Sequence, residues 1–356
     1  MSYKDIKINK INNWKEFQES YPDSFKKNKN TIEVKEMEID LEVSIAGRIM
    51  NIREIGKICF FSIKDFSGKC QIVLKEETVE KEMFKFYINN LDIGDHIGVI
   101  GKIFITKTGQ KSVLIEKITL LSKCLLTLPE KWHGIADEEL KLRKRYLDLI
   151  MNDEVKERFI KRNTIIQTIK NTLNSEEFIE VETPILQNIA SGAMASPFKT
   201  HHNALNIPLY LRIAPETYLK RLIAGGYERI YEIGKSFRNE GIDGSHLQEF
   251  TMLEYYAAYW NYHDSIEFVQ KIFNNVFKAL NIEESFEYEG KQVEIKNWEV
   301  ISYKDLIFKY TKLNLDELLQ DEKLLLEKFS SFIDVEQYKS IATMIDALYK
   351  KYCRPF

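Results

Sequence analysis

The sequence has few cysteines and almost no net charge. Its four cysteines, Cys59, Cys70, Cys124 and Cys353, are scattered without the spacing of metal ligands. Lys and Arg number 51 against 54 Asp and Glu, a net charge of −3, so the overall basic charge typical of nucleic-acid binding is absent and any RNA contact must come from local patches. There is also no signal peptide and no long apolar run. We therefore expect a reducing, cytoplasmic setting with no membrane contact, in which Cys59 and Cys70 are small core residues.

The first 40 residues are lysine-rich and weakly helical. Trp14, Phe17 and Tyr21 recur at helical spacing before Pro22, which predicts an N-terminal helical extension over residues 1–40. A partly docked tail is one interpretation. The other is a contact with a phosphate backbone through Lys26, Lys27 and Lys29.

Residues 41–125 change to short alternating strands. Strand patterns at 41–49, 58–66 and 70–74, a helical piece at 80–91 and two more strands at 94–106 and 113–121 fit within about 85 residues. This order predicts an OB-fold, a five-stranded barrel that binds oligonucleotides on one face. The side chains that we expect on or beside that face are Arg53, Phe60, Phe61 and Gln71. The pattern alone leaves open, for each of them, whether it belongs to the barrel core or to the surface.

A charged connector follows at 126–150, and we interpret it as a linker to a second domain at 151–356. That domain should open with an amphipathic helix at about 155–173 and end in a helical region at 316–352. Together the two parts predict an α+β protein.

The stretch from Tyr231 to Tyr256 predicts a β-hairpin whose polar loop is either a solvated tip or a binding site. Residues alternate with a period of two on both sides of a polar loop. The loop carries Arg238, Glu240 and His246, and it is longer than a hairpin needs for stability alone. Arg238 could hold a carboxylate or phosphate by two parallel hydrogen bonds, Phe250 offers a ring face to a purine, and Glu240 could accept from an amino group.

The order FRNE, loop, HLQEFTMLE resembles motif 2 of the class II aminoacyl-tRNA synthetases. The resemblance implies an antiparallel-sheet catalytic domain in which Arg238, Glu240, His246 and Phe250 bind ATP, with Arg238 catalytic. The run from Phe178 through Val181 to Pro184 is similar to motif 1, a helix and strand that the family uses for dimerisation.

THHNAL and LRIAPETYLKRL are similar to lysyl-tRNA synthetases in particular. This resemblance implies ATP-dependent activation of L-lysine and its transfer to tRNA(Lys) by a homodimer, with Mg²⁺ as cofactor. The implied lysine site consists of Gly192, Glu216, Arg238, Glu254 and Tyr256. The implied anticodon-binding residues of the barrel are Arg53, Phe60, Gln71 and Glu116.

Three departures from the family accompany this resemblance. Ser245 and Ser196 stand where arginine is common, which puts ATP affinity in doubt, and no Gly-x-Gly-x-Gly-x-x-Arg of motif 3 occurs. We therefore expect a chain truncated before motif 3, with no metal ligands of its own and the Mg²⁺ ligands in the part that would follow. Two alternatives stay open: a non-catalytic tRNA-binding or dimerising module that has lost motif 3, and a paralogue that lysylates something other than tRNA. The intact anticodon-binding positions argue against the paralogue.

Overall fold

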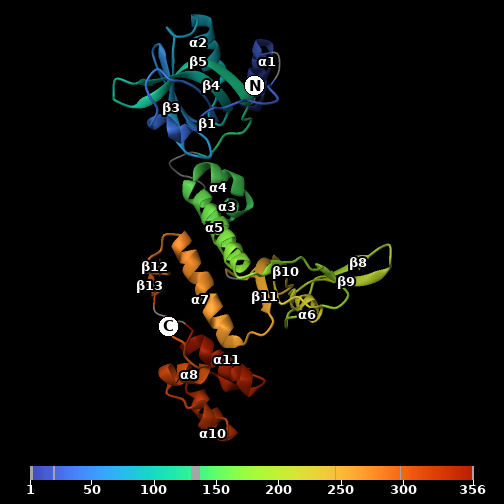
Figure 1. Ribbon diagram of the computed structural model, residues 1–356. Coiled ribbons are helices and arrows are strands. Elements are labelled where there is room, and N and C mark those ends of the chain that lie inside the picture. Colours follow the sequence, from blue (N-terminus) through green and yellow to red (C-terminus); the bar gives the residue numbers. More distant parts are fainter. Residues whose placement is uncertain (1–2, 19–20, 130–136, 245, 297, 355–356) are drawn as a thin grey trace. The chain divides into compact units, whose positions relative to one another are not determined.

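The computed structural model describes residues 3–18, 21–129, 137–244, 246–296 and 298–354. It divides into two compact units, residues 1–156 and 157–356, and each is described by itself. Figure 1 shows the strands of the first unit in blue and cyan and the helices of the C-terminal region in red.

The first unit contains the predicted OB-fold. β1 (Glu42–Ile55), β2 (Ile58–Lys64), β3 (Lys69–Lys75), β4 (His96–Ile105) and β5 (Lys111–Ser122) close into a barrel in the order β1-β2-β3-β5-β4, and α2 spans Lys81–Asn90. Alternate residues of β2 point inward, so Cys59, Phe61 and Ile63 are fully buried. The cysteine prediction is confirmed, since Cys59 and Cys70 are both buried in this core and burial raises the pKa of each thiol to about 12.

The N-terminal extension docks on the barrel. α1 (Tyr3–Gln18) inserts Trp14 into the barrel's core cluster, where its indole stacks on Tyr87 and its Nε1 donates to the carbonyl of Asn90 at 3.1 Å. The short 3-10 helix η1 (Thr31–Lys35) follows. Of the lysines considered for phosphate contact, Lys27 donates to Asn30 and to Asp65.

Asp65 links η1 to the turn between β2 and β3 by hydrogen bonds. Its carboxylate accepts from the backbone and hydroxyl of Thr31 at 3.1 and 2.6 Å, and from the backbone and hydroxyl of Ser67 at 2.8 and 2.6 Å. Burial alone would raise the pKa of Asp65, but these hydrogen bonds outweigh it and hold the pKa far below its ordinary value. The ionised carboxylate therefore stabilises the docked extension.

Two short helices, α3 (Glu138–Arg143) and α4 (Arg145–Met151), follow the barrel. Residues 130–136 of the predicted linker lie outside the described residues. The predicted long helix is present as α5 (Asp153–Ser175).

The second unit is built on small sheets. β10 (Arg229–Phe237) and β11 (Glu249–Ala257) form the predicted antiparallel hairpin, and β6 (Ile179–Glu180) pairs with β10 in parallel. β7 (Leu186–Gln187), β9 (Ile207–Leu211) and β8 (Lys199–His202) form a second, antiparallel sheet. The remaining elements of this region are α6 (Glu216–Ala224), α7 (Tyr262–Ala279), β12 (Ser285–Tyr288) and β13 (Lys291–Glu294).

The two faces of the β10–β11 hairpin have different roles. Tyr231 pairs with Tyr255, and their face packs on α5 and α7 through Leu173 and Phe268. Glu254 pairs with Glu232 and therefore lies on the other face. One face belongs to the core and the opposite face is left for polar groups.

The predicted C-terminal helical region is confirmed. It comprises α8 (Tyr303–Thr311), α9 (Leu315–Leu318), α10 (Glu322–Ser330), η2 (Val335–Gln337) and α11 (Ile341–Tyr352). Leu325, Phe329 and Leu348 are fully buried in a core cluster of this region alone.

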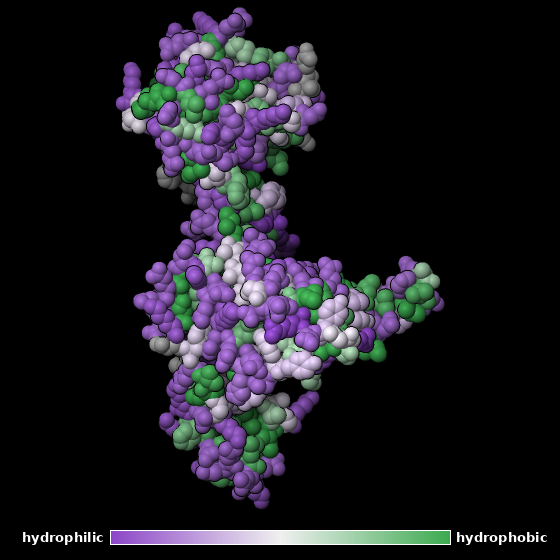
Figure 2. Space-filling model, viewed as in Figure 1, coloured by the Kyte–Doolittle hydropathy of each residue, from purple (hydrophilic) through white to green (hydrophobic). Residues whose placement is uncertain are grey.

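Hydrophilic residues cover most of the face seen in Figure 2, with hydrophobic residues in small separate groups. Among the described residues, no helix has the length and apolar composition that a membrane crossing requires.

The Asp65 cluster makes a testable prediction. Asp65→Asn should lower the free energy of unfolding of the barrel by about 2–4 kcal/mol at pH 7, because buried donors lose a charged acceptor. The stabilisation from Asp65 is present above the unfolded pKa of about 3.9 and is lost as the pH falls below it, so the difference should shrink between about pH 5 and pH 2.

Urea unfolding of the full chain, followed by tryptophan fluorescence at several pH values, measures this difference. Asp23→Asn, at an exposed aspartate, is the matched control and should leave the curve unchanged. A constant difference at every pH would contradict the role given to Asp65.

Candidate functional site

Arg238 lies at the end of the β10–β11 ladder, where its backbone N–H donates to the carbonyl of Gln248 at 2.8 Å. Its guanidinium carbon lies 5.2 Å from the centre of the Phe250 ring. Its Nε atom is buried and has no hydrogen-bond partner among the described residues. Buried polar atoms normally have partners, so an unsatisfied guanidinium N–H beside an aromatic face is suited to an anion attached to a planar ring.

The loop after Arg238 is tied to the segment at 191–198. The carboxylate of Glu240 accepts from the backbone N–H of Ser196 at 3.1 Å, and the carbonyl of Ser196 accepts from the N–H of Asn239 at 2.8 Å. Ser196, the position where arginine is common, therefore acts through its backbone. His246 is exposed and its Nδ1 lies 2.8 Å from a carboxylate oxygen of Asp243. Ser245 lies outside the described residues.

Four of the five predicted lysine-binding residues also come together, and the fifth, Arg238, lies at the other end of the strand pair. Glu254 and Tyr256 project from the same face of β11, and the Tyr256 hydroxyl donates to Glu254 at 3.4 Å. Glu216 opens α6, and Gly192 packs directly on it, since a Cβ at Gly192 would lie 3.0 Å from the Cβ of Glu216. Gly192 has a φ of +91°, a conformation that favours glycine.

The electrostatics of this group favour a bound cation. Burial and the nearby charge of Glu216 raise the pKa of Glu254, and burial with the charges of Glu254 and Glu216 raises the pKa of Tyr256 above its usual 10. Lys220 offsets part of this negative charge, with its Nζ 2.6 Å from Glu216. An ammonium group between the carboxylates would relieve their repulsion.

A buried charged cluster that the sequence did not reveal lies beside Glu254. Arg212 and Glu232 form an ion pair of 2.5 Å, and Thr183 donates to the other oxygen of Glu232 at 2.6 Å. Arg212 and Glu232 are only 2% and 4% exposed. No signal in the sequence pointed to this cluster, because Glu232 alternates with the core-facing Tyr231 and Ile233 and so has the pattern of an outward residue.

The predicted anticodon-binding residues lie on the outside of the barrel. Arg53 of β1 pairs with Phe60 of β2, and Gln71 of β3 follows the same outward alternation and donates to Ser112 at 3.1 Å. Glu116 of β5 is exposed, 3.7 Å from Lys102. The placement of Phe61 was wrong, because strand alternation turns it into the barrel core, where it is 1% exposed.

Motif 1 splits between core and surface. Phe178 is buried, with its ring stacked on Phe268 at 5.2 Å, and Val181 donates its N–H to the carbonyl of Tyr231. Pro184 is exposed. Apolar side chains near it are exposed as well, namely Ile179, Ile185, Leu186 and Ile189.

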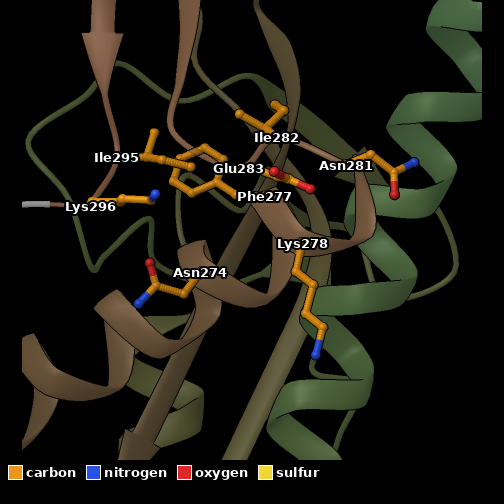
Figure 3. Close-up of a pocket in the computed structure, with 8 residues that line it drawn as sticks. All are labelled: Asn274, Phe277, Lys278, Asn281, Ile282, Glu283, Ile295 and Lys296. Carbon is orange, nitrogen blue, oxygen red and sulfur yellow. The ribbon is translucent and has the colours of Figure 1, made fainter.

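A hollow of about 510 Å³ lies elsewhere in the unit, between the end of α7 and the β12–β13 hairpin. Figure 3 shows Phe277 beside Ile295 at its centre and Lys278 extending away from them. None of the predicted site residues lines it. The β10–β11 face has the chemistry of a binding site, whereas this hollow has only volume.

Residues 137–351 match the family model of tRNA synthetases class II (D, K and N), and residues 43–121 match the OB-fold nucleic acid binding domain.

Three relatives named lysine–tRNA ligase are similar to the chain. That of Thermotoga sp. is 42% identical over 97% of this chain and 71% of its own length. That of Fusobacterium nucleatum is 42% identical over 89% of this chain and 64% of its own length. That of Aquifex aeolicus is 45% identical over 87% of this chain and 52% of its own length. The chain thus spans between about half and seven tenths of these relatives. Because the family model covers more than half of the chain, the chain belongs to the class II tRNA synthetases of the D, K and N family.

Proposed function

We propose that the protein acts in lysine–tRNA ligation, in which ATP activates L-lysine to lysyl-adenylate and the lysyl group passes to the 3′ end of tRNA(Lys). The observation that carries the proposal is the polar face of the β10–β11 hairpin. One end holds the carboxylates of Glu254 and Glu216, whose proximity to each other favours an ammonium. The other end holds Arg238 over Phe250, which favours an anion and a purine. The similarity to lysine–tRNA ligases supports the same substrate.

The face has a suitable length for an amino acid beside a nucleotide. Glu254 and Phe250 are four residues apart on one strand, which corresponds to about 13 Å. In the proposed reaction a carboxylate oxygen of lysine attacks the α-phosphorus, and the bond from that phosphorus to the oxygen of the leaving pyrophosphate breaks. A hydroxyl of the terminal tRNA ribose then attacks the lysyl carbonyl, loses its proton, and AMP leaves.

The side chains bind and orient in this scheme, and none forms a covalent bond. Arg238 holds the lysine carboxylate and the α-phosphate and stabilises the charge that grows between them. Phe250 stacks on adenine, Glu240 accepts from its amino group and His246 reaches the distal phosphates. Glu216, Glu254, Tyr256 and the backbone at Gly192 hold lysine.

Mg²⁺ would neutralise phosphate charge in this reaction. No group of three His, Cys, Asp or Glu side chains within the described part of the chain is arranged to hold a metal ion. We therefore assign no residue and no step to it.

The barrel would bind the anticodon of tRNA(Lys) through Arg53, Phe60, Gln71 and Glu116. Phe60 is half-buried on the outer face next to Arg53, which suits stacking on an unpaired base beside a cation. The exposed apolar residues around Pro184 support a homodimer formed through motif 1. A cytoplasmic location fits this function.

Removal of the charge of Glu254 tests the proposed lysine site. Glu254→Gln should weaken L-lysine binding about tenfold or more, because a charge-assisted hydrogen bond to an ammonium is worth about 1.5–3 kcal/mol. The same change should raise the melting temperature of the ligand-free chain at neutral pH, because the ionised Glu254 is disfavoured in the fold.

Calorimetry with L-lysine and thermal unfolding without ligand measure the two effects. Glu249→Gln, on the same strand but on the opposite face, is the matched control. Unchanged lysine affinity in Glu254→Gln would remove Glu254 from the site.

Replacement of Arg238 tests the proposed ATP site. Arg238→Lys should weaken ATP binding about tenfold or more, since lysine cannot form the planar two-bond contact with an α-phosphate. Arg221→Lys is the control, because Arg221 also lies over an aromatic ring, that of Tyr218, at 4.5 Å.

Equilibrium binding of a fluorescent ATP analogue measures both variants. Equal affinity in the two would show that Arg238 does not hold the phosphate.

A further inference from the structure

We infer that Arg212 is a positioning residue for the amino-acid site: it compensates the charge of Glu232 beside Glu254 and fixes the strand end that leads into Arg238. This inference deepens the proposed function and rests on it. It links the two ends of the polar face through one buried side chain that contacts neither substrate.

The backbone of Arg212 joins the two sheets of the unit. Its N–H donates to the carbonyl of Ile185 at 2.8 Å, and its carbonyl accepts from the N–H of Phe237 at 2.9 Å. Phe237 directly precedes Arg238. The position of Arg238 therefore depends on where the second sheet holds Arg212.

The side chain of Arg212 also forms hydrogen bonds with β10. Its Nε donates to the carbonyl of Lys235 at 2.8 Å, and its Nη1 donates to Glu232 and to Thr183. A Cβ at Gly234 would lie 2.2 Å from its Nη2, so only glycine there leaves room for the guanidinium against the strand. The cluster is buried, since Arg212 is only 2% exposed and Glu232 only 4%.

Glu232 lies directly opposite Glu254 in the hairpin register, and the two side chains share one face. Residues paired in this way have Cβ atoms about 4.5–5.5 Å apart. Without Arg212, Glu232 would add a third negative charge to those of Glu254 and Glu216. With Arg212 in place, the buried pair is neutral and the negative charge stays on the carboxylates that face a ligand.

The groups that surround Glu254 define what a pH measurement would report. They are Glu216 and Lys220 of α6, Tyr256 of its own strand, and Glu232 of β10 with its partner Arg212. Burial, Glu216 and Glu232 raise the pKa of Glu254, and Tyr256 and Lys220 lower it. A change confined to Arg212 or Glu232 leaves Glu216, Lys220 and Tyr256 in place.

The experiment measures the ligand-free melting temperature of the full chain from pH 4 to pH 9, with and without Glu254→Gln, in four backgrounds. These are the wild type, Arg212→Met, Glu232→Gln and the double variant Arg212→Met/Glu232→Gln. The stabilisation by Glu254→Gln grows with pH and stops growing at the pKa of Glu254 in the fold. The pH at which the stabilisation stops growing should rise by about one unit in Arg212→Met, because the charge of Glu232 is then uncompensated. It should fall by about one unit in Glu232→Gln, because the charge of Arg212 then remains alone. In the double variant it should return to the wild-type value.

A purely structural role for Arg212 would lower every melting temperature without moving this pH, and that result would overturn the inference. Gly234→Ala is a further arm that keeps both charges but crowds the guanidinium, and it should move the pH upward. If either single charge variant fails to fold, Gly234→Ala tests by itself whether Arg212 compensates the charge of Glu232.

L-lysine affinity measured in parallel separates the two claims. Absence of lysine binding by the wild type would overturn the proposed function. Lysine binding that is accompanied by an unmoved pH in all backgrounds would overturn the role of Arg212 alone.

Discussion

The buried ion pair between Arg212 and Glu232 is the constraint on which the candidate site depends. Two charges removed from water are tolerated only when they are paired and hydrogen-bonded, and here Thr183, Lys235 and Gly234 complete the arrangement. The same arrangement sets the end of β10 and the charge beside Glu254. The position of Arg238 and the charge around Glu254 therefore have a common origin.

The first unit relies on a similar principle at its surface. The ionised carboxylate of Asp65 joins η1 to the β2–β3 turn by several hydrogen bonds, while Trp14 anchors the preceding helix in the core. The extension thereby becomes part of the barrel, while Arg53 on the outer face stays exposed and Phe60 half-buried. In both units a charged side chain fixes the scaffold, and the side chains proposed for binding are different ones.

Much of the fold could be predicted from local patterns, because strand alternation and helical spacing are properties of neighbouring residues. The barrel, the hairpin and the grouping of Gly192, Glu216, Glu254 and Tyr256 follow from such patterns together with a family resemblance. The ion pair of Arg212 was not predicted, since Arg212 and its partners belong to three separate segments and only the fold brings them together. Phe61 was misplaced because the sequence alone did not fix which of two adjacent phenylalanines faces inward.

The central claim is that the polar face of the β10–β11 hairpin binds a diamino acid by its charges. Isothermal titration of the chain with L-lysine and with L-norleucine, which has the same carbon chain and lacks only the terminal ammonium, tests this claim most directly. The account predicts binding of lysine and at least about tenfold weaker binding of norleucine, since a charged hydrogen bond is lost. Equal affinity for the two, or no binding of lysine, would contradict it.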